Sequence, residues 1–199
     1  MHGNSAPIEW SLLGDDVRDR FDGSVPHLTF RSAEVRTEGT ATGCYMVRLL
    51  RLLGTAFPAP GQHRRAEIDV DVVAQGVRSW RRAYVDARGR LLRLDTVKTE
   101  EGGLIEERSG VLAIVLRPSV SEGRLVLTSE RFDIALGRMR IPLPEGLTPG
   151  RLVVEHRHEA DGGFTFDMRL VSPCLGEMFV HTGRFKDVRN DDDLHDRTT

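Results

Sequence analysis

The sequence predicts a single, mainly β domain in which a strongly curved antiparallel sheet or β-barrel packs against one amphipathic helix. About ten short segments alternate apolar and polar residues, and Ala66–Val72 does so without a break. A period of two is typical of a strand with one buried and one solvated face. Turn signals separate these segments at intervals of roughly 8 to 12 residues, which is the spacing of a β-meander. The 199 residues fit one domain with one hydrophobic core.

The two ends of the chain are predicted to lie outside this domain. Residues 1–9 read as a disordered leader, residues 10–186 as the β-rich domain, and residues 187–199, with the acidic run Asp191–Asp193, as a disordered tail. The leader has no basic region followed by an apolar core, so it does not resemble a secretory signal. We therefore expect a cytoplasmic protein.

One segment has helical instead of alternating periodicity. Thr42 is expected to cap a helix that runs to about Leu53, with Gly54 as a stop signal. The spacing of three and four places one apolar stripe on this helix, formed by Met46, Leu49, Leu50, Leu53 and Phe57. The stripe is expected to cover the inner face of the sheet. A helix lying on a membrane surface is the alternative, because Arg48 and Arg51 lie opposite the stripe.

The strands are expected to follow one another from Gly61 onward. Turn signals occur at Gln75–Gly76, Ala87–Gly89, Glu101–Gly103, Ser121–Gly123 and Asp161–Gly163. So many antiparallel strands in a small domain must curl or leave long edges open, which favours a barrel that is lipocalin-like in general shape. The prolines of Ile141–Gly150 lack the ladder donor, so this segment is predicted to be a rigid loop that crosses one end.

Composition excludes several classes of function. The chain has 28 basic and 30 acidic side chains, so it lacks the charge excess that nucleic acids or anionic membranes attract. Its longest apolar stretch is shorter than the ~20 residues of a membrane span. Cys44 and Cys174 form no Cys-x-x-Cys pair and are expected to be buried free thiols. No dinucleotide-binding or phosphate-binding loop occurs, and we expect no cofactor.

A candidate ligand-binding cluster lies on two predicted strands. Alternation places Trp80, Arg82 and Tyr84 on one face of a strand. Two strands further on, Glu107 can point to the same side of the sheet. If both faces point inward, Arg82 and Glu107 form an enclosed ion pair beside an aromatic wall, as a site that orients a small ligand requires. If the faces point outward, the same residues are ordinary surface charges.

Histidines supply a second candidate. His156 and His158 share one face of a predicted strand, and His181 could add a third imidazole. Two histidines spaced in this way can bind one metal ion. Ordinary strand histidines are the favoured interpretation, so no metal is predicted, but both residues remain ligand-binding candidates.

Five short motifs occur in an order that resembles a known bacterial family. They are Ser11–Gly14, Trp80–Arg82, Glu107–Gly110, Ile141–Pro144 and Ser172–Glu177. Together they resemble the domain of unknown function 4166 family over nearly the whole chain, from about Leu12 to Phe185. The resemblance implies no activity and no catalytic residues. Family members also occur fused to reductase-like domains, which implies a possible reductase-like partner protein. Where the family tends to have Tyr-x-Gly, this chain has His181-Thr182-Gly183.

Three functions remain open on sequence grounds. The barrel could bind a hydrophobic or amphipathic small molecule, or it could be an isomerase or cyclase of a biosynthetic pathway that uses Arg82, Glu107 and His156. It could also be an accessory or oligomerisation domain with a filled interior. The volume and the lining of the barrel interior discriminate between these three functions, because a ligand pocket needs a cavity of ~300 Å³ or more.

Overall fold

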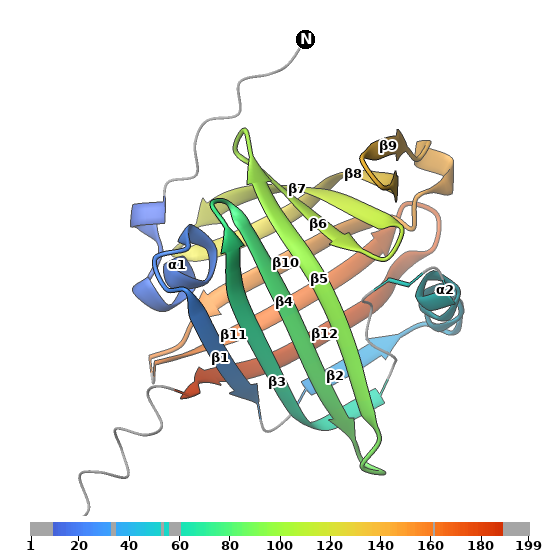
Figure 1. The fold of residues 1–199 in the computed structure, drawn as a ribbon. Helices are drawn as coiled ribbons and strands as arrows, with labels where there is room; N and C mark the ends of the chain where they lie inside the picture. Colours follow the sequence, from blue (N-terminus) through green and yellow to red (C-terminus); the bar gives the residue numbers. More distant parts are fainter. Residues whose placement is uncertain (1–9, 33–34, 53, 56–60, 161, 189–199) are drawn as a thin grey trace, which may run out of the picture.

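The computed structural model describes residues 10–32, 35–52, 54–55, 61–160 and 162–188. In this part of the chain, twelve strands pair into one antiparallel sheet that closes into a barrel with ten strands around its wall (Figure 1). The strands are β1 (His27–Ser32), β2 (Val35–Gly39), β3 (Gly61–Ala74), β4 (Val77–Asp86), β5 (Leu91–Glu101), β6 (Leu104–Ser109), β7 (Leu112–Ser121), β8 (Arg124–Leu136), β9 (Met139–Pro142), β10 (Arg151–His158), β11 (Gly163–Ser172) and β12 (Gly176–Asp187). Two α-helices, α1 (Asp15–Asp22) and α2 (Ala41–Leu52), and two short 3-10 helices, Trp10–Leu12 and Glu145–Leu147, accompany them.

The barrel closes through β1 and β2, which share one position in its wall. Strands β3 to β8 and β10 to β12 follow one another as a meander, and both β1 and β2 pair with β3 on one side and β12 on the other. Phe30 of β1 faces both Ile68 of β3 and Asp187 of β12. Asp187 therefore ends a strand and does not begin the tail that the sequence predicts. The predicted leader and residues 189–199 lie outside the described residues.

The alternation of buried and more exposed side chains along the strands places the hydrophobic core inside the barrel. On β3, the side chains of Ala66, Ile68 and Val70 are buried, while Glu67 and Asp69 between them are half-buried. Figure 1 shows β3, β4 and β5 crossing in front of β10, β11 and β12, so their inner faces enclose one interior. The predicted curved sheet is thus a closed barrel.

Helix α1, which was not predicted from the sequence, fills one end of the barrel. Val17 and Phe21, four residues apart, are fully buried on its inner face. The guanidinium of Arg20 is also buried and lies 3.4 Å from the centre of the Phe164 ring. Phe21 in turn contacts the ring of Trp80, with ring centres 5.4 Å apart. The end of the barrel near α1 is therefore packed with aromatic side chains.

Helix α2 has nearly the predicted bounds but a different buried face. The N–H of Gly43 donates to Thr40 Oγ1 at 3.1 Å, so Thr40 caps the helix in place of Thr42. Val47 and Leu50 are buried, whereas Leu49 of the predicted stripe is 46% exposed. Leu53 and Phe57, also predicted for this stripe, lie outside the described residues.

Helix α2 packs against two of the strands at the closure of the barrel. The helix packs on β12 and β2, far from α1 (Figure 1). Phe179, His181 and Phe185 of β12 point inward, so Met178 belongs to the outer face of this strand. A side chain at Gly43 would lie 1.9 Å from the carbonyl oxygen of Met178. The helix therefore lies directly against the backbone of β12.

Two further expectations need correction. Ile141 and Pro142, predicted to lie in a loop, belong to β9, which among the described strands pairs only with the edge of β8. Cys44 and Cys174 are free, as predicted, but Cys174 is exposed because it lies in the turn between β11 and β12. No helix in the described ranges is both long and apolar enough to cross a membrane.

Candidate functional site

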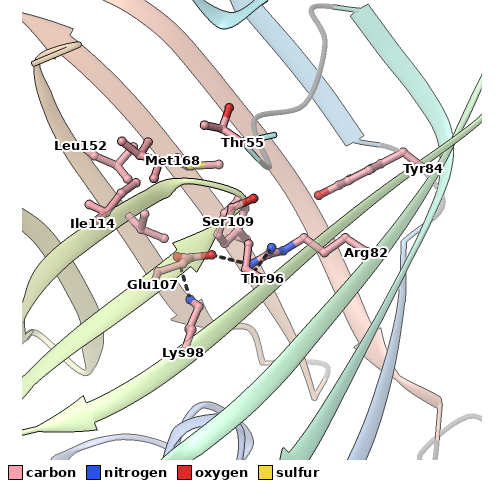
Figure 2. Close-up of a pocket in the computed structure, with 13 residues that line it drawn as sticks. Thr55, Arg82, Tyr84, Thr96, Lys98, Glu107, Ser109, Ile114, Leu152 and Met168 are labelled. Atoms are coloured by element: carbon pink, nitrogen blue, oxygen red, sulfur yellow. Dashed lines mark hydrogen bonds and ion pairs between the residues drawn. The ribbon is translucent and has the colours of Figure 1, made fainter. Parts of the chain in front are cut away.

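A partly open cavity of about 50 Å³ lies inside the barrel, between two chemically different walls. Strands β4, β5 and β6 contribute polar side chains, and β7, β10 and β11 contribute mostly apolar ones. The polar lining residues are Thr55, Arg82, Tyr84, Thr96, Lys98, Glu107 and Ser109, and the apolar ones are Leu112, Ile114, Leu152, Val154, Phe166 and Met168. Figure 2 shows Glu107, Thr96 and Arg82 on one side of the cavity and Ile114, Leu152 and Met168 on another. The lining is therefore amphipathic.

An ion-paired cluster forms the polar wall. Arg82 Nη2 donates to Glu107 Oε1 at 3.1 Å, and Lys98 Nζ lies 3.4 Å from Glu107 Oε2. Arg82 Nη1 donates to Thr96 Oγ1 at 3.0 Å. The side chains of Arg82, Lys98 and Glu107 are 12%, 6% and 15% exposed. The enclosed Arg82–Glu107 ion pair predicted from alternation forms, and Lys98 extends it to three charges.

This cluster holds Glu107 in its ionised form. Burial alone would raise the pKa of Glu107, but the charges of Lys98 and Arg82 and hydrogen bonds from Thr96 and Arg82 outweigh it and lower the pKa to about 2. Burial lowers the pKa of Lys98, whereas the Glu107 charge opposes that shift. The Lys98 ammonium also lies 4.4 Å from the centre of the Trp80 ring, a favourable position for a cation. Glu107 is therefore a fixed counter-ion near neutral pH.

A chain of neutral hydrogen-bonding groups runs from the cavity into the wall. The Tyr84 hydroxyl lies 3.4 Å from His181 Nε2, and His181 Nδ1 lies 2.8 Å from Thr37 Oγ1. Burial raises the pKa of Tyr84 to about 12. Burial, helped by the nearby His63 and Arg82, lowers the pKa of His181 to about 3. Tyr84 and His181 are thus both uncharged near neutral pH.

The structure brings together only some of the predicted site residues. Arg82, Tyr84 and Glu107 line the cavity, whereas Trp80 is buried next to Lys98 and outside the lining. His156 is 1% exposed and packs between Phe21 and Phe166, also outside the lining.

The two strand histidines do not share a site. Burial, with the nearby charge of Arg20, lowers the pKa of His156 well below its usual value. His158 is exposed, because it is the last residue of β10 and has left the barrel interior. Across the described ranges, no group of three or more His, Cys, Asp or Glu side chains is arranged to hold a metal ion.

Sequence reasoning missed two polar lining residues on β5. Thr96 and Lys98 share a face with buried Leu94, but that face of the strand carries no aromatic residue to indicate that it points inward. Register explains their proximity, because Thr96 pairs with Trp80 of β4 and Lys98 pairs with Glu107 of β6. The strand between the two predicted partners therefore completes the cluster.

Comparison with known proteins gives the chain its family. It is 23% identical over 193 residues to the Uncharacterized protein YndH of Bacillus subtilis strain 168, a match that covers 90% of this chain and 93% of YndH. A solved structure from Thermobifida fusca YX, described as a "putative thioesterase II", aligns over 78% of this chain and 96% of its own, with 12% identity and a TM-score of 0.27. So low a score carries no argument about activity. A sequence model described as "Domain of unknown function (DUF4166)" matches residues 17–185. Because this match extends from α1 to β12, the chain belongs to the domain of unknown function 4166 family.

Proposed function

We propose that the protein binds a small amphipathic molecule at the cavity between β4–β6 and β7, β10 and β11. The observation that carries this proposal is the division of one cavity into a polar, ion-paired wall and an apolar wall. Sites for small molecules typically combine mostly apolar surface with a few fixed polar groups that set orientation. A barrel whose only role was structural would gain more stability by filling this space with apolar side chains.

The size of the cavity limits the ligand. A volume of 50 Å³ is well below the ~300 Å³ of a pocket for a drug-sized molecule. It has room for about four water molecules, at ~10–15 Å³ for each water centre. The enclosed part of the ligand is therefore a polar head with a few carbon atoms, and any longer tail extends through the open side.

Two further polar groups in the cavity lining can bind a ligand head. Thr55 Oγ1 is buried and has no hydrogen-bond partner among the described residues. The Tyr84 hydroxyl reaches His181 only at 3.4 Å, which leaves it able to bind a closer partner. A buried polar atom without a partner costs about 1–3 kcal/mol, so a ligand that satisfies Thr55 gains affinity.

The chemistry of Glu107 supports binding more than catalysis. An isomerase or cyclase needs a base whose pKa lies near the working pH. With a pKa of about 2, Glu107 is a poor proton acceptor. His156, the other proton carrier suggested by the sequence, lies outside the cavity lining.

Binding can be tested with five-carbon probes that fit the enclosed volume. Pentan-1-ol, pentanamide and pentanoate are titrated into isotope-labelled protein, and amide chemical shifts are followed by NMR. We expect saturable shifts at Ile114, Leu152 and neighbouring residues that line the cavity. Met168→Trp should abolish them by filling the space, whereas Val171→Trp, on the exposed face of the same strand, should leave them unchanged. The proposal fails if no probe gives saturable shifts, or if Met168→Trp leaves them intact.

A further inference from the structure

We infer that the ligand of this cavity is a monoanion, a small carboxylate whose negative charge is held by Lys98 and Arg82. This inference rests on the proposed function and adds the chemical class of the ligand. It follows from the balance of charge in the lining and from the donors that the cluster leaves unused.

The lining carries one more positive charge than negative charge. Arg82 and Lys98 are its cations, and Glu107 is its only anion among the described lining residues. His181, beside Tyr84, does not change the balance because burial lowers its pKa to about 3. An uncompensated charge in a low-dielectric interior is costly, and an opposite charge on a ligand removes that cost.

A second source of positive potential lies nearby. The charge of Arg20 on α1 contributes to lowering the pKa of Lys98, which lines the cavity, and of His156, which lies outside the lining. A cationic ligand would therefore be repelled by Arg82 and Lys98, whereas an anion would be attracted.

The donors of the cluster are not exhausted by Glu107. Lys98 has three N–H donors and only one ion-pair partner, Glu107, in the described part of the chain. Arg82 has five N–H donors, of which one bonds Thr96 and one bonds Glu107. A carboxylate can accept from both cations through its two oxygens, and such charge-assisted bonds are among the strongest in proteins. The ligand would occupy the same polar wall as Glu107 without displacing it.

Matched probes test the charge separately from binding itself. Pentanoate, pentanamide and pentylammonium share a chain length and differ in charge. At pH 7 we expect pentanoate to bind the wild-type protein at least about tenfold more tightly than pentanamide, and pentylammonium to bind most weakly. This comparison needs no variant, so it does not depend on how any substitution folds.

A variant tests the assignment to Lys98. Lys98→Met keeps an apolar stem and leaves Glu107 paired with Arg82, so we expect the preference for pentanoate over pentanamide to fall to about threefold or less. Arg93→Met, on the exposed face of the same strand, serves as the control and should keep the full preference.

The outcomes separate the two proposals. If pentanamide or pentylammonium binds wild-type protein as tightly as pentanoate, the charge inference is wrong and the binding function stands. If the preference for pentanoate survives Lys98→Met, the assignment of the charge to Lys98 is overturned. If none of these three probes binds and pentan-1-ol does not bind either, the proposed function fails, and the inference fails with it.

Discussion

Glu107 is the anion of the buried charge cluster that lines the cavity. It accepts from Arg82 and Thr96 and lies against the Lys98 ammonium, all within a largely buried space. A buried ion pair contributes little net stability compared with apolar residues of the same shape, because both charges lose their water. Removing one member of the pair is strongly destabilising, because the remaining buried charge then has no partner of opposite charge.

We therefore predict that Glu107→Gln lowers the free energy of unfolding by about 3–5 kcal/mol, the typical cost of leaving a buried charge without its partner. Urea denaturation of both proteins at pH 7 measures this difference. Glu67→Gln is the control, because Glu67 pairs with Arg31 on the outer surface, where both side chains are more than a third exposed. That change should cost less than about 1 kcal/mol. Equal effects of the two substitutions would mean that the Glu107 cluster is effectively solvated.

His181 should make stability depend on pH. Its pKa of about 3 in the folded protein lies below its ordinary value of 6.5, so the unfolded chain binds a proton first as pH falls. The contribution of His181 is therefore complete above pH 6.5 and is lost between pH 6.5 and 3. In this range the free energy of unfolding should fall by up to about 1.4 kcal/mol per pH unit from this one group.

His181→Gln removes this proton and leaves a polar side chain beside Tyr84 and Thr37. We expect its free energy of unfolding to fall less steeply than that of the wild type between pH 6.5 and 4, as measured by urea denaturation at several pH values. The remaining slope comes from His156 and, below about pH 4.5, from Glu107. Identical slopes in the two proteins would contradict a buried, neutral His181.

The sequence predicted the Arg82–Glu107 ion pair but not Lys98, which also contacts Glu107, and the reason is physical. An aromatic residue on the same face, Trp80, marked the Arg82 face as buried. Thr96 and Lys98 have no such neighbour on their own strand beyond Leu94, so their face resembles a solvated one. Only the register between β4, β5 and β6 brings Lys98 next to Glu107, and register is not visible in one strand alone.

At the scale of elements, the two helices show where sequence patterns succeed and fail. The α2 segment has a continuous apolar stripe, and its bounds were predicted to within about one residue. The α1 sequence, DDVRDRFD, has only Val17 and Phe21 to bury, and its charged residues hide that short stripe. Arg20 is buried as well, which no hydrophobic pattern would indicate. Hydrophobic periodicity therefore could not predict α1, the helix that fills one end of the barrel.

The close packing of α2 also explains why its buried face differs from the predicted apolar stripe. Gly43 lies against the Met178 carbonyl, where any Cβ would clash, so the glycine side of the helix must face the barrel. Val47 and Leu50, on that side, are buried as a result, and Leu49 turns outward. Because a glycine adds nothing to a hydrophobic stripe, the sequence pattern could not reveal that it sets the contact.

Two adjacent leucines of α2 provide a matched test. Leu50→Ala should lower the free energy of unfolding by about 2–5 kcal/mol, because Leu50 is buried and its loss leaves a cavity. Leu49→Ala should change it by about 0.5 kcal/mol or less, because that side chain is 46% exposed. Chemical denaturation of the two variants measures both values. If Leu49→Ala lowers the free energy of unfolding more than Leu50→Ala does, the face of α2 that contains Leu49 is the buried one, as the sequence predicted.

At the scale of the whole molecule, alternation predicted a curved sheet but left its closure open. The meander order follows from short turns between neighbouring strands, which the sequence shows directly. Closure depends on pairing β12 with β1 and β2, which lie 140 or more residues away along the chain, as in the contact between His181 and Thr37. Such long-range pairing has no local signal. Gly183 fits this seam because a side chain there would lie 2.9 Å from Val35.

The last prediction tests this closure by hydrogen exchange. In an open sheet β12 would be an edge strand, and every second amide along it would point to solvent and exchange quickly. In the closed barrel, residues from Phe179 to Gly183 lie between β11 and β2, so consecutive amides are all bonded to one neighbour or the other. We expect each of them to exchange about a thousandfold more slowly than in an unfolded peptide, which corresponds to an opening free energy of about 4 kcal/mol. Strand β9 is the internal control, because it pairs only with β8 and its unpaired amides should exchange quickly. NMR detection resolves individual amides, and alternating fast and slow exchange along β12 would show that the barrel is open at this seam.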